Sequence, residues 1–124
     1  MADGQLQVEL VAADRVVWSG QADEVVARTV EGDLGVLRGH APLLSVLVPG
    51  VVTIRSGAET VVAVVEDGFL SVADDRISIL SEDTHLVSEL DKGTVQAELE
   101  QARADDDQAA VARAEAKLRG IELA

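Results

Sequence analysis

The sequence predicts an all-β sandwich of short antiparallel strands, followed by a carboxyl-terminal antiparallel α-helical hairpin. Valine dominates the first ninety residues, and β-branched side chains favour pleated sheet. Turn signals separate the apolar runs at a spacing of roughly ten residues, as in sandwiches and barrels. From about Lys92 onward Ala, Glu, Asp and Gln take over, a composition typical of helices. We therefore expect a sandwich domain over residues 1–86 and a two-helix hairpin over 91–124.

The first half of the expected sandwich contains three strands and a glycine-rich stretch. Apolar and polar residues alternate over 6–10, as in a half-buried strand. A second strand covers 15–18 and is expected to end at Ser19-Gly20. A third covers 25–30, with Arg28 and Thr29 interrupting its apolar run.

The second half of the sandwich repeats the alternation more clearly. Residues 52–55 alternate and end at a Ser-Gly turn. Residues 60–65 are almost continuously apolar, which predicts a strand buried on both faces. Residues 70–72 and 77–79 alternate on either side of two aspartates at 74–75, which predicts a β-hairpin.

After Asp91 the apolar period changes to that of a helix. One stripe falls at i, i+4 and i+7 and another at i, i+3 and i+7. The stripes are Val95, Leu99 and Ala102, then Val111, Ala114 and Leu118. Residues 105–107, all Asp, predict the turn between the helices, and Asp91 and Asp107 are candidate helix caps. Because the stripes are thin and rich in Ala, we expect the hairpin to dock weakly and to be able to move.

Charge and composition exclude several classes of function. The formal net charge is −13, so a surface for nucleic acid or anionic lipid is not expected. A protein partner with basic loops is the better electrostatic match. There is no Cys, hence no disulfide or thiolate chemistry. Neither a signal peptide nor a run of about 18 apolar residues is found, so we expect no transmembrane segment.

The segment between Gly32 and Pro49 has the most constrained backbone. It contains three of the ten glycines and both prolines, residues that fix or open φ in turns. It contains no nucleophile paired with a base and no cluster of metal ligands, so we interpret it as a docking surface. His40 is accordingly interpreted as structural or interfacial, because no ligand or catalytic partner accompanies it.

Four blocks of the chain resemble the epsilon subunit of F-type ATP synthases. They read EGDLGVLRGHAPLLSVLVPGVV from Glu31, DGFLSV from Asp67, RISIL from Arg76 and LRGIEL from Leu118. Their order and spacing cover essentially the whole chain. The resemblance implies a non-catalytic rotor subunit of the central stalk, which couples the gamma subunit to the c-ring and regulates ATP hydrolysis through the hairpin. It would be a peripheral protein on the cytoplasmic face of the bacterial cell membrane.

The resemblance also implies docking residues. Asp33 would meet the polar loops of the c-ring, although a turn Asp that bonds its own backbone is the alternative. The loop Gly39, His40, Ala41, Pro42 and its successor Leu43 would face gamma and the c-ring. Arg38 stands where the family usually has Pro, so this contact is expected to be arranged differently.

Some members of the family bind ATP through a motif that ends in Arg-Ala. Here Leu90-Asp91 is kept, but Thr94 stands where the arginine should be, and Thr offers no charge to a phosphate. Asp91 and Arg103 are the remaining candidate nucleotide-binding residues, with helix capping as the alternative role of Asp91. Apart from regulatory ATP we expect no cofactor and no metal.

Two other classes of function stay open. If the rotor assignment fails, the chain is either a nucleotide-sensing module or an unrelated acidic β-sandwich adaptor. In the rotor assignment the partners are gamma, the c-ring and, through the hairpin, the alpha and beta subunits. Enzyme activity is not expected, because the carboxylate pairs lie in turn-like, solvated sequence with nothing to separate their pKa values.

Overall fold

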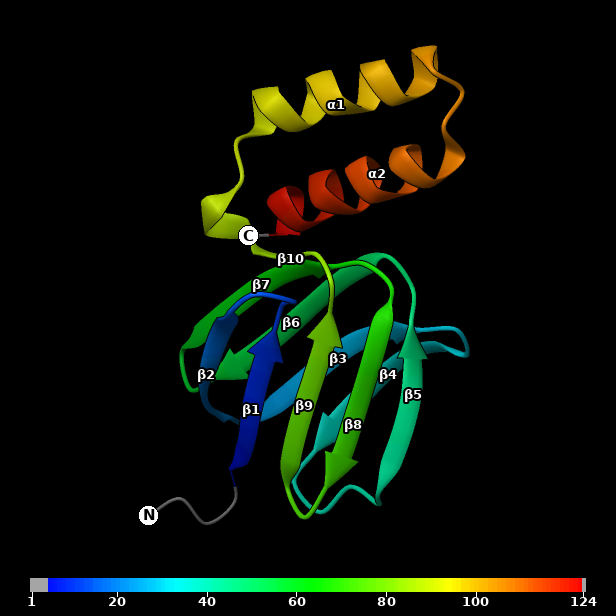
Figure 1. The fold of residues 1–124 in the computed structure, drawn as a ribbon. Coiled ribbons are helices and arrows are strands. Elements are labelled where there is room, and N and C mark those ends of the chain that lie inside the picture. Colours follow the sequence, from blue (N-terminus) through cyan, green and yellow to red (C-terminus); the bar gives the residue numbers. More distant parts are fainter. Residues whose placement is uncertain (1–4, 124) are drawn as a thin grey trace.

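The computed structural model describes residues 5–123 and contains two layers of strands capped by two helices (Figure 1). The strands are β1 (Leu6–Val11), β2 (Val16–Ala22), β3 (Glu24–Thr29), β4 (Gly32–Leu37), β5 (Leu43–Leu47), β6 (Gly50–Ser56), β7 (Glu59–Val65), β8 (Gly68–Ala73), β9 (Arg76–Ser81) and β10 (Thr84–Leu86). A 3₁₀ turn, Val87–Glu89, leads to the helices α1 (Lys92–Ala104) and α2 (Gln108–Leu123). The predicted fold class, a β-sandwich followed by a helical hairpin, is confirmed.

One continuous sheet folds over on itself to make the sandwich. Its strand order is β10-β7-β6-β3-β5-β8-β9-β1-β2, with β4 paired to β3. Neighbouring strands are antiparallel except β1 and β9, which run parallel. The sheet encloses a core of aliphatic side chains in which Leu6, Leu10, Ile54 and Ile79 are fully buried. The predicted alternation in β1, β8 and β9 is therefore confirmed: every second side chain of each strand is buried in this core.

β7 is buried on both faces, as its continuous apolar run predicts. Ala63 and Val65 belong to the sandwich core, whereas Val62 and Val64 belong to a second cluster with Ala116 of α2. The helical hairpin supplies the second layer that such a strand needs.

Two sequence-based predictions about strand limits were wrong. β2 continues through Ser19-Gly20, where we expected it to end. A Cβ at Gly20 would lie 3.0 Å from the Trp18 ring, a tight contact, so this glycine makes room for a side chain and does not end the strand. Arg28 lies within β3 and does not interrupt it, because a strand that faces solvent on one side accepts charged residues at alternate positions.

The turns and caps of the second half follow their sequence signals. Asp74 and Asp75 have φ of 51° and 60°, as a two-residue type I′ hairpin requires. The Asp91 carboxylate accepts a 2.9 Å hydrogen bond from the Thr94 backbone N–H, and Asp107 accepts one of 3.1 Å from Ala110. Both predicted helix caps are confirmed.

The hairpin contacts the sandwich through one helix. Figure 1 shows α2 between α1 and the sheet, and α2 packs on β6 and β7. α1 packs on α2 through Val95 and Leu99, which meet Ala114 in a cluster of their own. The hairpin thus has a separate apolar core and a narrow attachment to the sandwich.

Candidate docking surfaces

The Gly39–Leu43 loop is held at the end of the sandwich away from the helices. The Gly39 backbone N–H donates to the Asp75 carboxylate at 2.7 Å, which ties the loop to the β8–β9 turn. Gly39 has φ of +83°, a conformation that favours glycine. His40 Nδ1 lies 2.7 Å from the Ala41 carbonyl oxygen. The loop is therefore a fixed, largely exposed protrusion, and within residues 5–123 His40 bonds only to local backbone.

Asp33 lies apart from this loop. It is the second residue of β4 and pairs with Arg28 of β3, and its carboxylate is 3.4 Å from the Arg28 guanidinium. β4 runs for six residues before the loop begins, a length of about 20 Å at the rise of an extended strand. Asp33 instead borders a shallow groove with Arg119 and Leu123 of α2. The structure thus divides the predicted docking residues between the two ends of β4.

A row of exposed apolar side chains crosses the outer face of the sandwich. Val46, Phe69 and Leu80 are register partners on β5, β8 and β9, and their exposed fractions are 45%, 52% and 51%. Leu44, 70% exposed, points outward two residues before Val46 and extends the row toward the Gly39–Leu43 loop. We call Leu44, Val46, Phe69 and Leu80 the outer row. Contiguous exposed apolar surface of this kind marks an interaction site.

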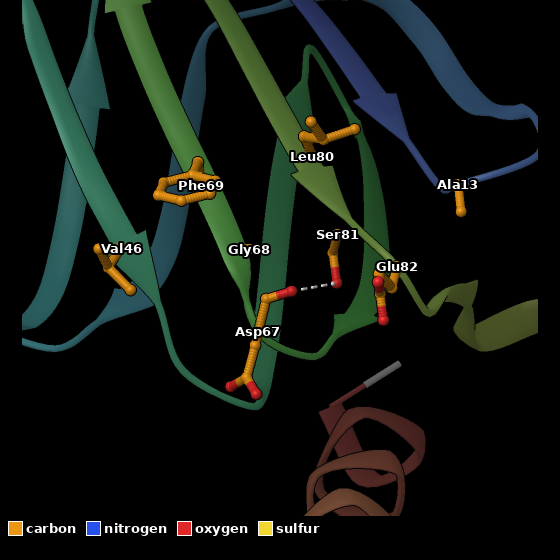
Figure 2. Close-up of a pocket in the computed structure, with 8 residues that line it drawn as sticks. All are labelled: Ala13, Val46, Asp67, Gly68, Phe69, Leu80, Ser81 and Glu82. Atoms are coloured by element: carbon orange, nitrogen blue, oxygen red, sulfur yellow. Dashed lines mark hydrogen bonds between the residues drawn. The ribbon is translucent and has the colours of Figure 1, made fainter.

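The outer row borders a cavity of about 580 Å³ with acidic residues on its edge. Figure 2 shows Phe69, Leu80 and Val46 on neighbouring strands, with Asp67 and Glu82 beside them. The Ser81 hydroxyl donates to the Asp67 carbonyl oxygen at 3.2 Å and fixes the turn. A partner that fits this surface presents apolar side chains flanked by basic groups.

The outer row was not predicted from the sequence, although the sequence contains a signal for it. Residues 43–47 read LLSVL, so both phases of β5 carry apolar residues. Phe69, the only Phe of the chain, likewise stands in the outward phase beside the inward Leu70. A strand of a one-sided sheet alternates with polar residues, so apolar residues in both phases indicate a second covered face.

The two candidate nucleotide-binding residues are not brought together. Asp91 bonds both the backbone N–H and the hydroxyl of Thr94, and these bonds hold the pKa of the Asp91 carboxyl below its usual value. Arg103 is twelve residues along the same helix, about 18 Å away at the helical rise. Its guanidinium lies 4.0 Å from Glu115 of α2. Asp91 acts here as a helix cap.

Residues 5–123 contain no group of three His, Cys, Asp or Glu side chains placed to hold a metal ion. No helix among them has the length and hydropathy to span a bilayer.

The joint between α2 and the sheet is made of small residues. Ala116 is fully buried against Val62, Val64 and Val87. A Cβ added to Gly120 would lie 2.8 Å from Val64 Cγ2. α2 therefore approaches the sheet most closely at small residues, and Ile121 is the partly buried larger side chain of α2 that packs beside them.

Comparison with known families and proteins gives a consistent match. The family described as "ATP synthase, Delta/Epsilon chain, beta-sandwich domain" matches residues 5–87. The chain is 54% identical over 118 residues to the ATP synthase epsilon chain of Streptomyces avermitilis, covering 94% of this chain and 95% of that one. It is 44% identical over 123 residues to the ATP synthase epsilon chain of Corynebacterium diphtheriae, covering 98% and 95%.

Solved structures agree with the fold. A chain of the Euglena gracilis mitochondrial ATP synthase, in a structure of OSCP, F1 and c-ring, superposes with a TM-score of 0.73 at 27% identity, covering 96% of this chain and 78% of that one. A chain from the central stalk and c-ring of the Tetrahymena thermophila mitochondrial ATP synthase superposes with a TM-score of 0.63 at 17% identity, covering 94% and 96%; this likeness concerns the fold alone.

Proposed function

The chain belongs to the ATP synthase delta/epsilon family, and from that premise we propose how its surfaces serve the rotor. Its relatives over nearly the full length are ATP synthase epsilon chains, so it is a non-catalytic rotor subunit of the central stalk. It takes part in ATP synthesis as part of the assembled, membrane-associated complex, and the chemistry is done by other subunits. The contacts that hold it in the rotor are the subject of the proposal.

The outer row is the docking face for the gamma subunit in this proposal. The observation that carries it is the exposure of Val46, Phe69 and Leu80 side by side on three paired strands. Burying such a row against a partner stabilises association by about 25 cal/mol for each Å² of apolar surface removed from water. The acidic edge at Asp67 and Glu82 favours a partner with flanking basic residues.

The Gly39–Leu43 loop meets the c-ring in the same proposal. It lies at the end of the sandwich opposite the hairpin and is fixed by the Asp75 carboxylate, so it is a preformed surface that loses little entropy on docking. Leu44 links it to the outer row, and one continuous surface then serves both partners. Asp33 lies outside this surface, and we assign it to a separate contact with the polar loops. In this proposal the chain lies on the cytoplasmic face of the membrane.

The docking proposal is tested by substituting Phe69 with Asp in the tagged chain. Gamma and the c-ring should then no longer co-purify with the tagged chain from detergent-solubilised membranes. The reason is that docking would desolvate the new carboxylate against an apolar partner. The matched control is Leu123→Asp, which places the same charge on a 66% exposed leucine of the hairpin. Equal recovery of gamma by the wild-type chain and the Phe69 variant would refute the assignment.

We also propose that the hairpin regulates hydrolysis. Packed on the sandwich, it leaves rotation free; extended, it reaches the alpha and beta subunits and blocks ATP hydrolysis. The narrow joint at Ala116 and Gly120 favours such a two-state element, since two packings that differ by a few kcal/mol suffice for a switch. Deletion of residues 91–124 should raise hydrolysis by the assembled enzyme, and unchanged hydrolysis would contradict the proposal.

The nucleotide-sensing alternative has weaker support, so we propose that no cofactor is required. Asp91 is occupied as a cap, and Arg103 is directed to Glu115. Calorimetry of the full chain with ATP and magnesium tests this directly. Heat of binding that disappears in an Arg103→Gln variant would restore the alternative.

A further inference from the structure

The 3₁₀ turn between β10 and the hairpin is bonded to a distant part of the sandwich. Arg15 Nη2 donates to both oxygens of the Glu89 carboxylate, at 3.1 and 3.4 Å. The same carboxylate accepts a 3.1 Å hydrogen bond from the Leu86 backbone N–H. Arg15 lies in the turn between β1 and β2, which the Ala12 N–H closes by donating to the Arg15 carbonyl oxygen at 2.9 Å. One carboxylate therefore joins the end of β10 to the opening turn of the sandwich.

The inner side of the 3₁₀ turn is held by apolar packing. The Val87 side chain is buried in one cluster with Val62 and Val64 of β7. The side chains of Arg15 and Glu89 are 46% and 39% exposed, and an ion pair of that exposure is weak by itself. The hold on the turn comes from the combination of three charge-assisted hydrogen bonds to one carboxylate with the burial of Val87. These bonds, first that from Arg15 and then that from Leu86, hold the pKa of the Glu89 carboxyl below its usual value.

The next two residues belong to neither rigid part. Leu90 and Asp91 are extended, with φ of −95° and −106°. The bonds of the Asp91 carboxylate and carbonyl run forward, to Thr94 and Val95 of α1. A swing of the whole hairpin therefore requires changes of φ and ψ at Leu90 and Asp91 alone.

We propose that Arg15 is a positioning residue that fixes the pivot of the hairpin between Glu89 and Lys92. When the hairpin detaches, α1 and α2 leave together, while the 3₁₀ turn stays on the sandwich. This inference deepens the proposed regulatory role, and it rests on the detachment that this role requires.

The position of the pivot limits how far the released hairpin travels. Two extended residues span about 7 Å, so the first turn of α1 stays that close to Glu89. Without the bonds from Arg15 the free segment also includes residues 87–89, and five residues span about 17 Å. A short tether keeps the released hairpin at a high effective concentration beside its docking site. Arg15 thus controls the reach of the hairpin from the opposite end of the sequence.

The test measures two distances in the full chain. The chain has no Cys, so spin labels can be placed at chosen pairs of positions. Ser71→Cys on β8 with Ser88→Cys reports the 3₁₀ turn, and Ser71→Cys with Glu100→Cys reports α1. Release is induced by Ile121→Asp, because docking would place the new carboxylate in the apolar cluster of α2 and β7. We expect the 71–100 distance to become broad while the 71–88 distance stays single and narrow.

A second substitution tests the role of the arginine. Adding Arg15→Gln to the Ile121→Asp chain should widen the 71–88 distribution about twofold, because three further residues become free. The matched control is Arg55→Gln, which removes an exposed ion pair within the sandwich, 3.3 Å from Glu24, and should leave the 71–88 distance narrow. An equal response to Arg15→Gln and Arg55→Gln would overturn the assignment of Arg15.

The two distances also separate this inference from the regulatory role. If both distances broaden in Ile121→Asp alone, the turn leaves with the hairpin, and the fixed pivot is wrong although detachment stands. If the 71–100 distance stays narrow, the hairpin does not detach, and the regulatory role and the pivot are both refuted.

Discussion

The sandwich core and the contact between α2 and the sheet are packed with residues of opposite size. The core uses large aliphatic side chains such as Leu6, Ile54 and Ile79, all fully buried. The joint uses Ala116 and Gly120, and brings α2 so close that a Cβ on Gly120 would collide with Val64. Large side chains bury enough apolar area to give the core most of its stability. The small side chains of α2 make a close but narrow contact, from which the hairpin can detach while the sandwich stays folded.

The largest effect should come from opening the core. Ile79→Ala removes a fully buried side chain and should lower the free energy of unfolding by about 2–5 kcal/mol, from lost transfer energy and the cavity left behind. Urea unfolding followed by circular dichroism measures it. Leu80→Ala, the exposed neighbour on the same strand, should change stability by less than about 0.5 kcal/mol. Equal losses of unfolding free energy in the two variants would contradict the distinction between core and outer row.

A smaller effect is expected at the joint. Gly120→Val should weaken docking of the hairpin by about 1–3 kcal/mol, because its branched side chain meets Val64 and Val87. Hydrogen exchange of the α2 amides should accelerate while the urea midpoint of the sandwich stays in place. Ala112→Val adds the same β-branched side chain on the exposed face of α2 and serves as control. Loss of sandwich stability in the Gly120 variant would show that the two regions are one cooperative unit.

One residue of the core itself departs from the rule of apolar packing. Ser45 is buried on the inward face of β5, and its hydroxyl finds no hydrogen-bond partner within residues 5–123. Ser45→Ala should stabilise the chain by about 1 kcal/mol, since a buried unsatisfied hydroxyl is removed. Thermal unfolding compares it with Ser78→Ala on the exposed face of β9, where no gain is expected. A destabilised Ser45 variant would mean that the hydroxyl is bonded after all.

The smallest effect concerns the ion pair across the joint. Arg113→Gln should weaken docking by about 0.5 kcal/mol at low salt, because the partly exposed pair with Glu66 is screened by solvent. Hydrogen exchange of the α2 amides reports it, and the effect should shrink at high salt. Arg103→Gln, whose contact with Glu115 lies within the hairpin, should leave docking unchanged. If Arg113→Gln lowers the docking free energy more than Gly120→Val does, charge rather than close packing is the main contribution to docking.

Local patterns could be predicted from the sequence, and long-range placements could not. The alternation in β8 and β9, the two-faced β7 and the caps at Asp91 and Asp107 each depend on neighbours within a few residues. The outer row depends on β5 lying beside β8, and Val46 and Phe69 are far apart in the chain. No local pattern reports which strands become neighbours.

The divided docking residues have the same cause. The family resemblance implies one docking surface for Asp33 and His40, but the extended β4 between them carries them to opposite ends of the sandwich. Glu66 and Asp83 show the reverse case: they are far apart in sequence, and the Glu66 backbone N–H donates to the Asp83 carbonyl oxygen at 3.2 Å only after β7 and β9 are placed.

The most direct test is the rate of ATP hydrolysis by the assembled enzyme with three forms of this chain. The account predicts that Gly120→Val, which frees the hairpin, lowers hydrolysis below that of the wild-type chain. It predicts that deletion of residues 91–124 raises it, and that all three forms remain bound to the rotor through the sandwich. Equal hydrolysis with all three forms, at equal occupancy of the rotor, would contradict a fixed docking domain with a releasable regulatory hairpin.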